Sequence, residues 1–182
     1  MKLPSQLYHP LVVISSFFVF ILSVFFLLHF YTDFKLPRVL GITQHPGSVN
    51  LVLPEEIHVN QAFNLSIEID TNNQQVNAAG IYLRFNPNHL QVVDIDTGDS
   101  FCQFYPEKKY DNSQGLVSLA CGSPHPGFSG KNTLMVLKIQ PLISGPSSIQ
   151  LDPQSRLLLS DGKGTNILHQ HQRIPFNILT SL

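Results

Sequence analysis

The chain has 182 residues, which is room for one domain and a short additional segment. Charged residues make up 13% of the sequence and the formal net charge is −1. No basic patch of the kind that nucleic-acid-binding proteins carry is visible, so the composition argues against a nucleic-acid partner.

The N-terminal segment is strongly apolar. Residues 11–28 read LVVISSFFVFILSVFFLL, without a charge or a proline. This length matches the roughly 20 residues that a membrane-spanning helix needs. We therefore predict a short cytoplasmic tail over residues 1–10 and a transmembrane signal anchor over residues 11–31, through which the chain contacts the lipid bilayer.

The alternative for this segment is a cleaved signal peptide. The apolar region of a signal peptide is usually only about 7–15 residues long and ends at a small-residue site. Here the apolar run is longer and continues into His29-Phe30-Tyr31. With the short N-terminal tail and the cysteine pair discussed below, this favours a single-pass protein of the cell membrane whose C-terminal domain is extracellular.

Residues 32–47 are predicted to be a linker, because prolines and glycines interrupt regular structure there. From Ser48 to Leu182 short apolar runs alternate with turn residues. The clearest run is residues 63–70, in which apolar and polar side chains alternate as in a half-buried strand. We expect nine strands, near residues 49–53, 63–69, 81–85, 90–95, 116–121, 133–140, 149–151, 157–160 and 174–178.

The centre of this region is a strand, turn and strand between Ala79 and Gly98. Apolar residues alternate with Tyr82 and Arg84 in the first strand, and Asn86-Pro87-Asn88 has strong turn chemistry. A strand pair is not stable alone in water, so the other strands must pack on it. Short strands without a convincing helix predict an all-β sandwich.

The order of these features resembles the bacterial cohesin domain, a nine-stranded jelly-roll β-sandwich. The similar stretches are VNLVLPEEIHVNQAFNLSIEID, AAGIYLRFNPNHLQVVDIDTG and NTLMVLKIQPLISGPSSIQL, followed by an Asp-Gly turn and a closing strand, so that residues 48–179 are covered. The resemblance implies non-covalent binding of a dockerin-like or other surface protein. Cohesins usually sit in large scaffold proteins of polysaccharide breakdown, whereas this chain carries one module on its own anchor.

Cys102 and Cys121 are the only cysteines. An external domain would allow them to form a disulfide, and closing a loop of this size contributes on the order of 3 kcal/mol in the chain-entropy model. The alternative is two independent buried thiols.

Strand alternation also predicts a binding face. If Ile81 and Leu83 point inward, Tyr82 and Arg84 point outward. Cohesins hold their partner on an outer sheet face, so the resemblance implies a patch there, rimmed by polar residues. We place it at Tyr82, Arg84, Leu116, Ser118, Leu134 and Val136. The alternatives are a face covered by another segment, or a register shifted by one residue, which would exchange the two faces.

Carbohydrate-binding modules share the same sandwich superfamily, so polysaccharide is the alternative partner. Sugar platforms generally use exposed aromatic rings. This chain has no Trp, but the stretch FCQFYPEKKY, which we expect to be a loop, offers Phe104, Tyr105 and Tyr110.

The sequence contains little that supports catalysis. Gly127-Phe128-Ser129-Gly130 is one residue shorter than a nucleophile elbow, and the Asp residues near residue 96 lack the spacing of a calcium loop. We therefore expect a protein that is not an enzyme and has no cofactor and no metal site.

Overall fold

The computed structural model describes residues 18–26, 46–169 and 172–180. The chain divides into two units, residues 1–43 and residues 44–182. In the first unit, residues 18–26 form a short helix with exposed side chains. No helix among the described residues is long and apolar enough to cross a membrane. Residues 11–17 and 27–31 of the predicted anchor lie outside the described part of the chain.

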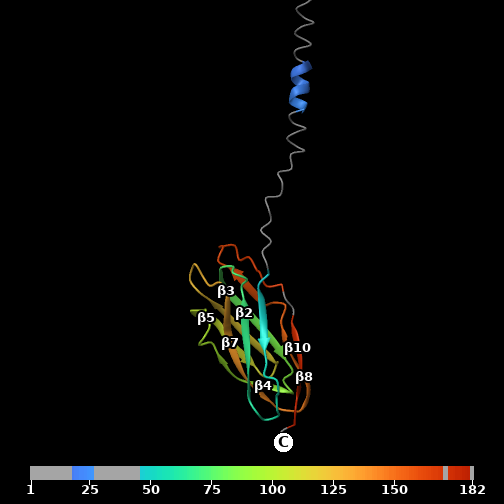
Figure 1. The fold of residues 1–182 in the computed structure, drawn as a ribbon, viewed down its shortest axis with the longest axis vertical. Coiled ribbons are helices and arrows are strands. Elements are labelled where there is room, and N and C mark those ends of the chain that lie inside the picture. The colour runs from blue at the N-terminus through green and yellow to red at the C-terminus, as the bar shows by residue number, and fades with distance from the viewer. Residues whose placement is uncertain (1–17, 27–45, 170–171, 181–182) are drawn as a thin grey trace, which may run out of the picture. The chain divides into compact units, whose positions relative to one another are not determined.

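The second unit is an all-β sandwich of two antiparallel sheets (Figure 1). One sheet has four strands in the order β1-β2-β7-β4, which are β1 (Ser48–Val52), β2 (Phe63–Asp70), β7 (Lys131–Pro141) and β4 (Leu90–Asp96). The other has six strands, with the order β10-β8-β3-β6-β5 and with β9 paired to β3. These are β10 (Arg173–Ile178), β8 (Gly145–Leu151), β3 (Val76–Phe85), β6 (Leu116–Gly122), β5 (Phe104–Asp111) and β9 (Arg156–Leu159).

The core lies between the two sheets and is built by the alternation of the strands. In β2 every second side chain is buried, and the same period holds through most of β3 and β6. The large side chains that are almost completely buried come from both sheets: Leu65, Ile67, Ile69, Leu90, Leu134, Met135, Leu137 and Ile139 from one, and Ile81, Leu83, Leu119 and Ile149 from the other. Burying each such side chain contributes about 1.5–3 kcal/mol, so this shared interior holds the two sheets together.

The sandwich has ten strands where the sequence predicted nine. The additional strand is β5, which lies in the stretch expected to be a loop. β5 is an edge strand, its register shifts between Phe104 and Glu107, and most of its side chains are exposed. An edge strand with one neighbour and no buried face has no clean period of two, which is why alternation did not reveal it.

The strand β7 departs from simple alternation at one position. Its pairing with β2 shifts so that Ile67 lies opposite Met135 and Glu68 lies opposite Thr133. Leu134 is the extra residue of this β-bulge, and both Leu134 and Met135 are buried. The prediction that Leu134 points outward with Val136 was therefore wrong, because the bulge turns Leu134 into the core.

Candidate functional site

The outer surface of the six-stranded sheet is here called the six-strand face. Tyr82, Arg84, Leu116 and Ser118 all lie on it, because their neighbours in sequence, among them Leu83 and Val117, are buried. This agrees with the outward direction predicted for these four residues. The strand β5, which the sequence did not predict, pairs with β6 and extends this face at its edge.

The register of the strands arranges the six-strand face in rows. Across the sheet, Arg84 lies opposite Gln150 of β8 on one side and Leu116 of β6 on the other. The row continues outward to Arg173 of β10 and to Asp111 of β5. This row takes one residue from each of β10, β8, β3, β6 and β5, and neighbouring strands are about 4.8 Å apart. The next rows along β3, β6 and β5 are Tyr82, Ser118 and Lys109, then Gly80, Ala120 and Glu107, then Ala78, Gly122 and Phe104.

Arg84 is fixed by an ion pair with Asp152. The Nε of Arg84 donates to Oδ2 of Asp152, whose side chain is 8% exposed while that of Arg84 is 57% exposed. The backbone N–H of Gln154 and the Arg84 guanidinium hold the pKa of Asp152 below its usual value, against the opposing effect of burial. The guanidinium of Arg84 is therefore held at the surface while its negative partner is out of reach of an incoming protein.

Tyr82 is positioned by both its backbone and its hydroxyl group. Its backbone N–H donates to the Oγ of Ser155 at 3.0 Å, and its carbonyl accepts from the N–H of Asp152 at 2.8 Å. Its hydroxyl lies 3.5 Å from Oε2 of Glu107 on β5, which also forms an ion pair with Lys109 at 2.9 Å. The hydrogen bond and charge of Glu107 raise the pKa of Lys109. These contacts link β3, β5 and the β8–β9 loop on one surface.

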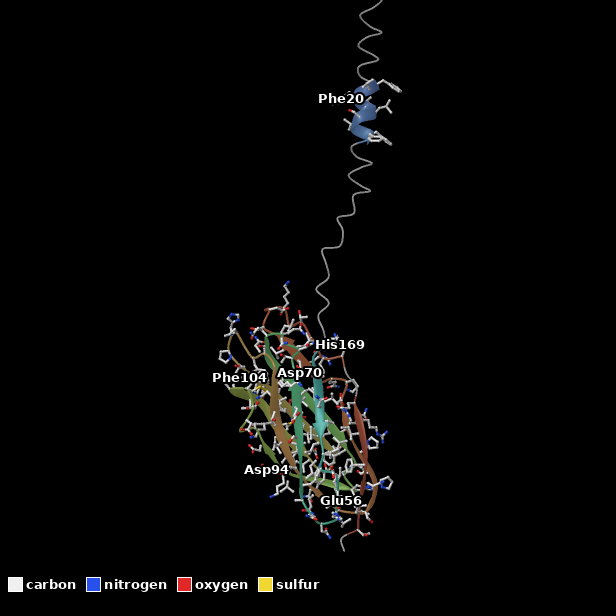
Figure 2. All side chains as sticks on the ribbon, in the orientation of Figure 1. Phe20, Glu56, Asp70, Asp94, Phe104 and His169 are labelled. Carbon is white, nitrogen blue, oxygen red and sulfur yellow. A yellow bond between two sulfur atoms is a disulfide. The ribbon has the colours of Figure 1, made fainter. Side chains whose placement is uncertain are left out.

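The three aromatic residues proposed for carbohydrate do not share a face. Phe104 is 53% exposed and lies on the six-strand face, at the edge of the domain in Figure 2. Its ring rests on Gly122, where an added Cβ would approach the ring to 2.3 Å. Tyr105 packs toward the core, with its hydroxyl 3.2 Å from the carbonyl oxygen of Cys102. The hydroxyl of Tyr110 donates to the carbonyl of Val93 on β4 at 3.1 Å.

The outer surface of the four-stranded sheet, the four-strand face, has a different composition. Val136 lies there, on the opposite side of the sandwich from Tyr82 and Arg84, so the predicted patch does not form as one surface. Carboxylates dominate this face: Glu68, Asp70, Asp94 and Asp96 lie beside Lys131 and Lys138. A hollow of about 430 Å³ lined by Asp70, Asp99 and Lys131 opens at one end of it.

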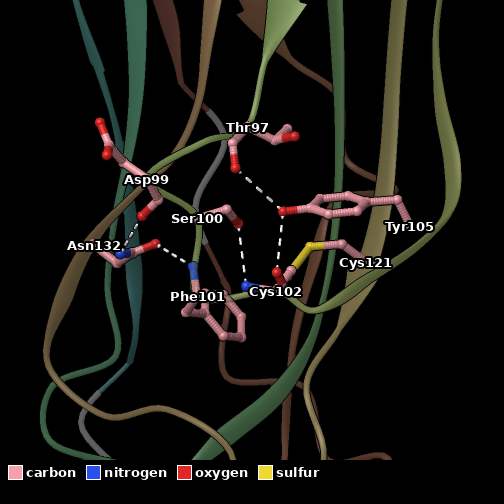
Figure 3. The surroundings of a disulfide bond; sticks show 8 residues. All are labelled: Thr97, Asp99, Ser100, Phe101, Cys102, Tyr105, Cys121 and Asn132. Carbon is pink, nitrogen blue, oxygen red and sulfur yellow. Dashed lines mark hydrogen bonds between the residues drawn. A yellow bond between two sulfur atoms is a disulfide. The ribbon is translucent and has the colours of Figure 1, made fainter.

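Cys102 and Cys121 are joined in a disulfide, with their Cα atoms 5.7 Å apart (Figure 3). It fastens the loop after β4 to β6, beneath the six-strand face. On the other side the same loop is held by Asn132 of β7, which accepts from the N–H of Phe101 and donates to the carbonyl of Asp99, each at 2.9 Å (Figure 3). The loop that crosses between the sheets is thus attached to both of them.

Among residues 18–26, 46–169 and 172–180, no group of three or more His, Cys, Asp or Glu side chains could hold a metal ion. The polar groups of the six-strand face are spread in rows across its strands.

Comparison with known proteins gives matches of structure alone. No family model and no curated protein matches the chain. A cohesin module from a Clostridium perfringens family 33 glycoside hydrolase matches with a TM-score of 0.62 and 16% identity, over 75% of this chain and 99% of that chain. The OlpC cohesin of Clostridium thermocellum, solved in a complex with a dockerin, has a TM-score of 0.59 and 11% identity over 75% of this chain and 96% of that chain.

A type III cohesin from the ScaE cell-surface anchoring scaffoldin of Ruminococcus flavefaciens matches with a TM-score of 0.56 and 11% identity, over 74% of this chain and 88% of that chain. The β-sandwich has the cohesin fold. The resemblance read from the sequence is therefore confirmed at the level of fold. These matches span nearly the whole length of the cohesin modules. The β-sandwich of this chain is called the cohesin-fold domain below.

The sequence did not reveal several residues that shape the six-strand face of the cohesin-fold domain. Asp152, Glu107 and Lys109 position Arg84 and Tyr82, and Arg173 extends the central row to the sheet edge. Asp152 stands directly before a proline, and this pattern predicts a turn. It does not indicate an ion pair. Only the pairing of β8 with β3 brings it next to Arg84.

Proposed function

We propose that the cohesin-fold domain binds a dockerin-like protein module without covalent chemistry, and that the six-strand face is the binding surface. The observation that carries this is the set of adjacent rows of outward side chains on paired strands, in which Asp152 holds Arg84 and Glu107 holds Tyr82. Prearranged Arg and Tyr side chains are the residue types that most often dominate protein interfaces. Several cohesins of this fold are solved in complexes with dockerins, which supports the same kind of partner.

The geometry favours a protein partner over polysaccharide. A sugar platform needs rings presented on one surface, and of the three candidate aromatic residues only Phe104 lies on the six-strand face. The hydroxyl groups of Tyr105 and Tyr110 are instead used in hydrogen bonds to backbone carbonyls. The proposed role is that of a binding module and not of an enzyme.

The test uses one substitution placed on each face. Leu116 and Val136 are both partly buried, outward-pointing residues in inner strands of their sheets, so Leu116→Asp and Val136→Asp are matched variants. The full chain is screened against a panel of purified dockerin modules by calorimetry. For a dockerin that binds, Leu116→Asp should weaken binding by about 100-fold, as expected for a charge at the centre of an interface, while Val136→Asp should leave it within about threefold.

Loss of binding in the Val136 variant alone would assign the interface to the four-strand face and contradict the proposal. Binding by no dockerin, together with binding of a polysaccharide that Phe104→Ala abolishes, would replace it with the carbohydrate function. Circular dichroism of both variants checks that the sandwich remains folded.

We further propose that residues 11–31 anchor the protein in the cell membrane as a single span, with the domain on the extracellular side. The apolar sequence of this segment supports the anchor, and the disulfide of the domain suits an oxidising compartment. Protease added to intact cells should digest the domain. A protected domain, or a mature chain that begins after residue 31, would contradict this topology.

A further inference from the structure

One end of the six-strand face is hollowed where β8 and β10 pair. The hollow has a volume of about 470 Å³ and is lined by Asn86, Pro146, Ser147, Ser148, Arg173 and Pro175. Ser148 lies opposite Pro175 in the sheet, and the adjacent pair is Gln150 with Arg173. The hollow therefore continues the row that contains Arg84 and is part of the same surface.

The polar groups of this hollow include three potential hydrogen-bond donors and no acidic side chain. Arg173 donates from Nε to the Oγ of Ser148 at 3.0 Å. The two terminal NH₂ groups of its guanidinium remain available to a ligand. The Oδ1 of Asn86 accepts from the N–H of Asn88, so its amide group NH₂ is available. The hydroxyl of Ser148 accepts from Arg173, so its own O–H can serve as the third donor, whereas Ser147 points to the core side of β8 together with Ile149 and Leu151.

Arg173 differs in its ion pairing from the cations in the central part of the six-strand face. Arg84 is paired with Asp152, and Lys109 is paired with Glu107. In the part of the chain that the structure describes, no carboxylate forms a salt bridge with Arg173. An incoming negative charge would therefore be attracted to Arg173 more than to its neighbours, and a guanidinium binds carboxylates with good geometry.

From this arrangement we propose that the hollow at Arg173 receives the carboxylate of an acidic side chain on the protein partner. The inference rests on the proposed binding function of the six-strand face and specifies the chemistry of the partner at its edge. Arg173 lies two strands from Arg84, about 10 Å away, which is within the footprint of an ordinary protein interface. Pro146 and Pro175 form rigid walls, so the hollow admits a short side chain from a partner that lies flat on the sheet.

The test needs no identified partner. The full-length chain, labelled with ¹⁵N in a zwitterionic detergent, is titrated with the peptide acetyl-Gly-Glu-Gly-amide and with its Gln analogue, and NMR shifts are recorded. The Glu peptide should shift the amide signals of Ser148 and Arg173 in a saturable way, and the Gln peptide should bind at least about fivefold more weakly. Arg173→Gln should weaken binding of the Glu peptide about tenfold.

Arg156→Gln is the matched control. Arg156 is also an exposed arginine on this sheet, but it donates to the carbonyls of Pro153 and Ser155 and does not line the hollow, so its loss should leave the titration unchanged. Equal shifts from both peptides, no shift from either, or unchanged binding in Arg173→Gln would each overturn the inference. Shifts with inorganic phosphate but not with the Glu peptide would assign the hollow to a small free anion and overturn it as well. None of these results depends on Leu116 or on dockerin binding, so the inference can fail while the proposed function stands.

Discussion

The two outer faces of the sandwich share one core but present different chemistry. The six-strand face carries Arg84 and Arg173 in one row and an aromatic ring resting on Gly122. The four-strand face carries a group of carboxylates around Lys131 and Lys138. Alternation within a strand decides which side chains point outward, but the neighbouring strands decide which of them form one surface. Tyr82 and Val136 both point outward and yet lie on opposite sides of the domain.

This difference has a consequence for binding. A partner with acidic groups would be attracted to the arginines of the six-strand face and repelled by the carboxylates of the four-strand face. Both faces carry charges of both signs, but carboxylates outnumber lysines in the group on the four-strand face, and the near-neutral net charge of the whole chain conceals this contrast. The three predictions that follow test how far the two faces are independent.

The largest expected effect concerns the bulge of β7, which separates Leu134 from Val136. Leu134→Ala should lower the free energy of unfolding by about 2–5 kcal/mol, because it opens a cavity in the shared core. Val136→Ala should cost less than about 1 kcal/mol, because Val136 points out of the four-strand face. Urea denaturation followed by circular dichroism measures both. Equal losses in the two variants would mean that β7 alternates without a bulge and that Leu134 lies on the outer surface.

The second prediction compares the two attachments of the loop after β4. Replacing Cys102 and Cys121 by Ser should lower the free energy of unfolding by about 3 kcal/mol, since the disulfide closes a loop with a sequence separation of 19. Asn132→Ala removes two hydrogen bonds on the four-strand side and should cost about 1–2 kcal/mol. Hydrogen exchange should locate the change in β5 and β6 for the first variant and in residues 98–101 for the second. Exchange that rises throughout both sheets in either variant would argue against separate attachments.

The smallest expected effect is the pH dependence of the Arg84–Asp152 pair. A carboxyl whose pKa is lowered by folding stabilises the protein above its unfolded pKa, and this contribution is lost as the pH falls through the folded pKa. Arg84→Gln should raise the pKa of Asp152 toward its usual value and destabilise the protein at neutral pH by about 1 kcal/mol, a modest figure because Arg84 is largely exposed.

The loss caused by Arg84→Gln should shrink as the solution is made acidic, because a protonated Asp152 no longer needs a cation. Unfolding midpoints in urea measured from about pH 7 to about pH 3 would show this. Arg156→Gln is the control: Arg156 donates to the carbonyls of Pro153 and Ser155, so any effect of that substitution should not vary across this range. A loss in Arg84→Gln that stays constant with pH would show that the ion pair does not account for the lowered pKa.

The sequence by itself determined the fold class and most of its strands. Alternation of apolar and polar residues in β2, β3 and β6 is a local property of the chain, and it correctly gave their buried and outward sides. The order of strands and turns was enough to indicate the cohesin fold, which the structural matches confirm.

Tertiary structure alone decided which outward residues meet. The edge strand β5 has no buried face that a period of two could reveal, and the bulge that turns Leu134 inward exists only because β7 pairs with β2. The ion pair of Arg84 joins residues 68 positions apart, and Arg173 joins the same row only through β8. Periodicity carries information over a few residues, whereas a binding surface is assembled from strands whose neighbours are fixed by the packing of the whole sandwich.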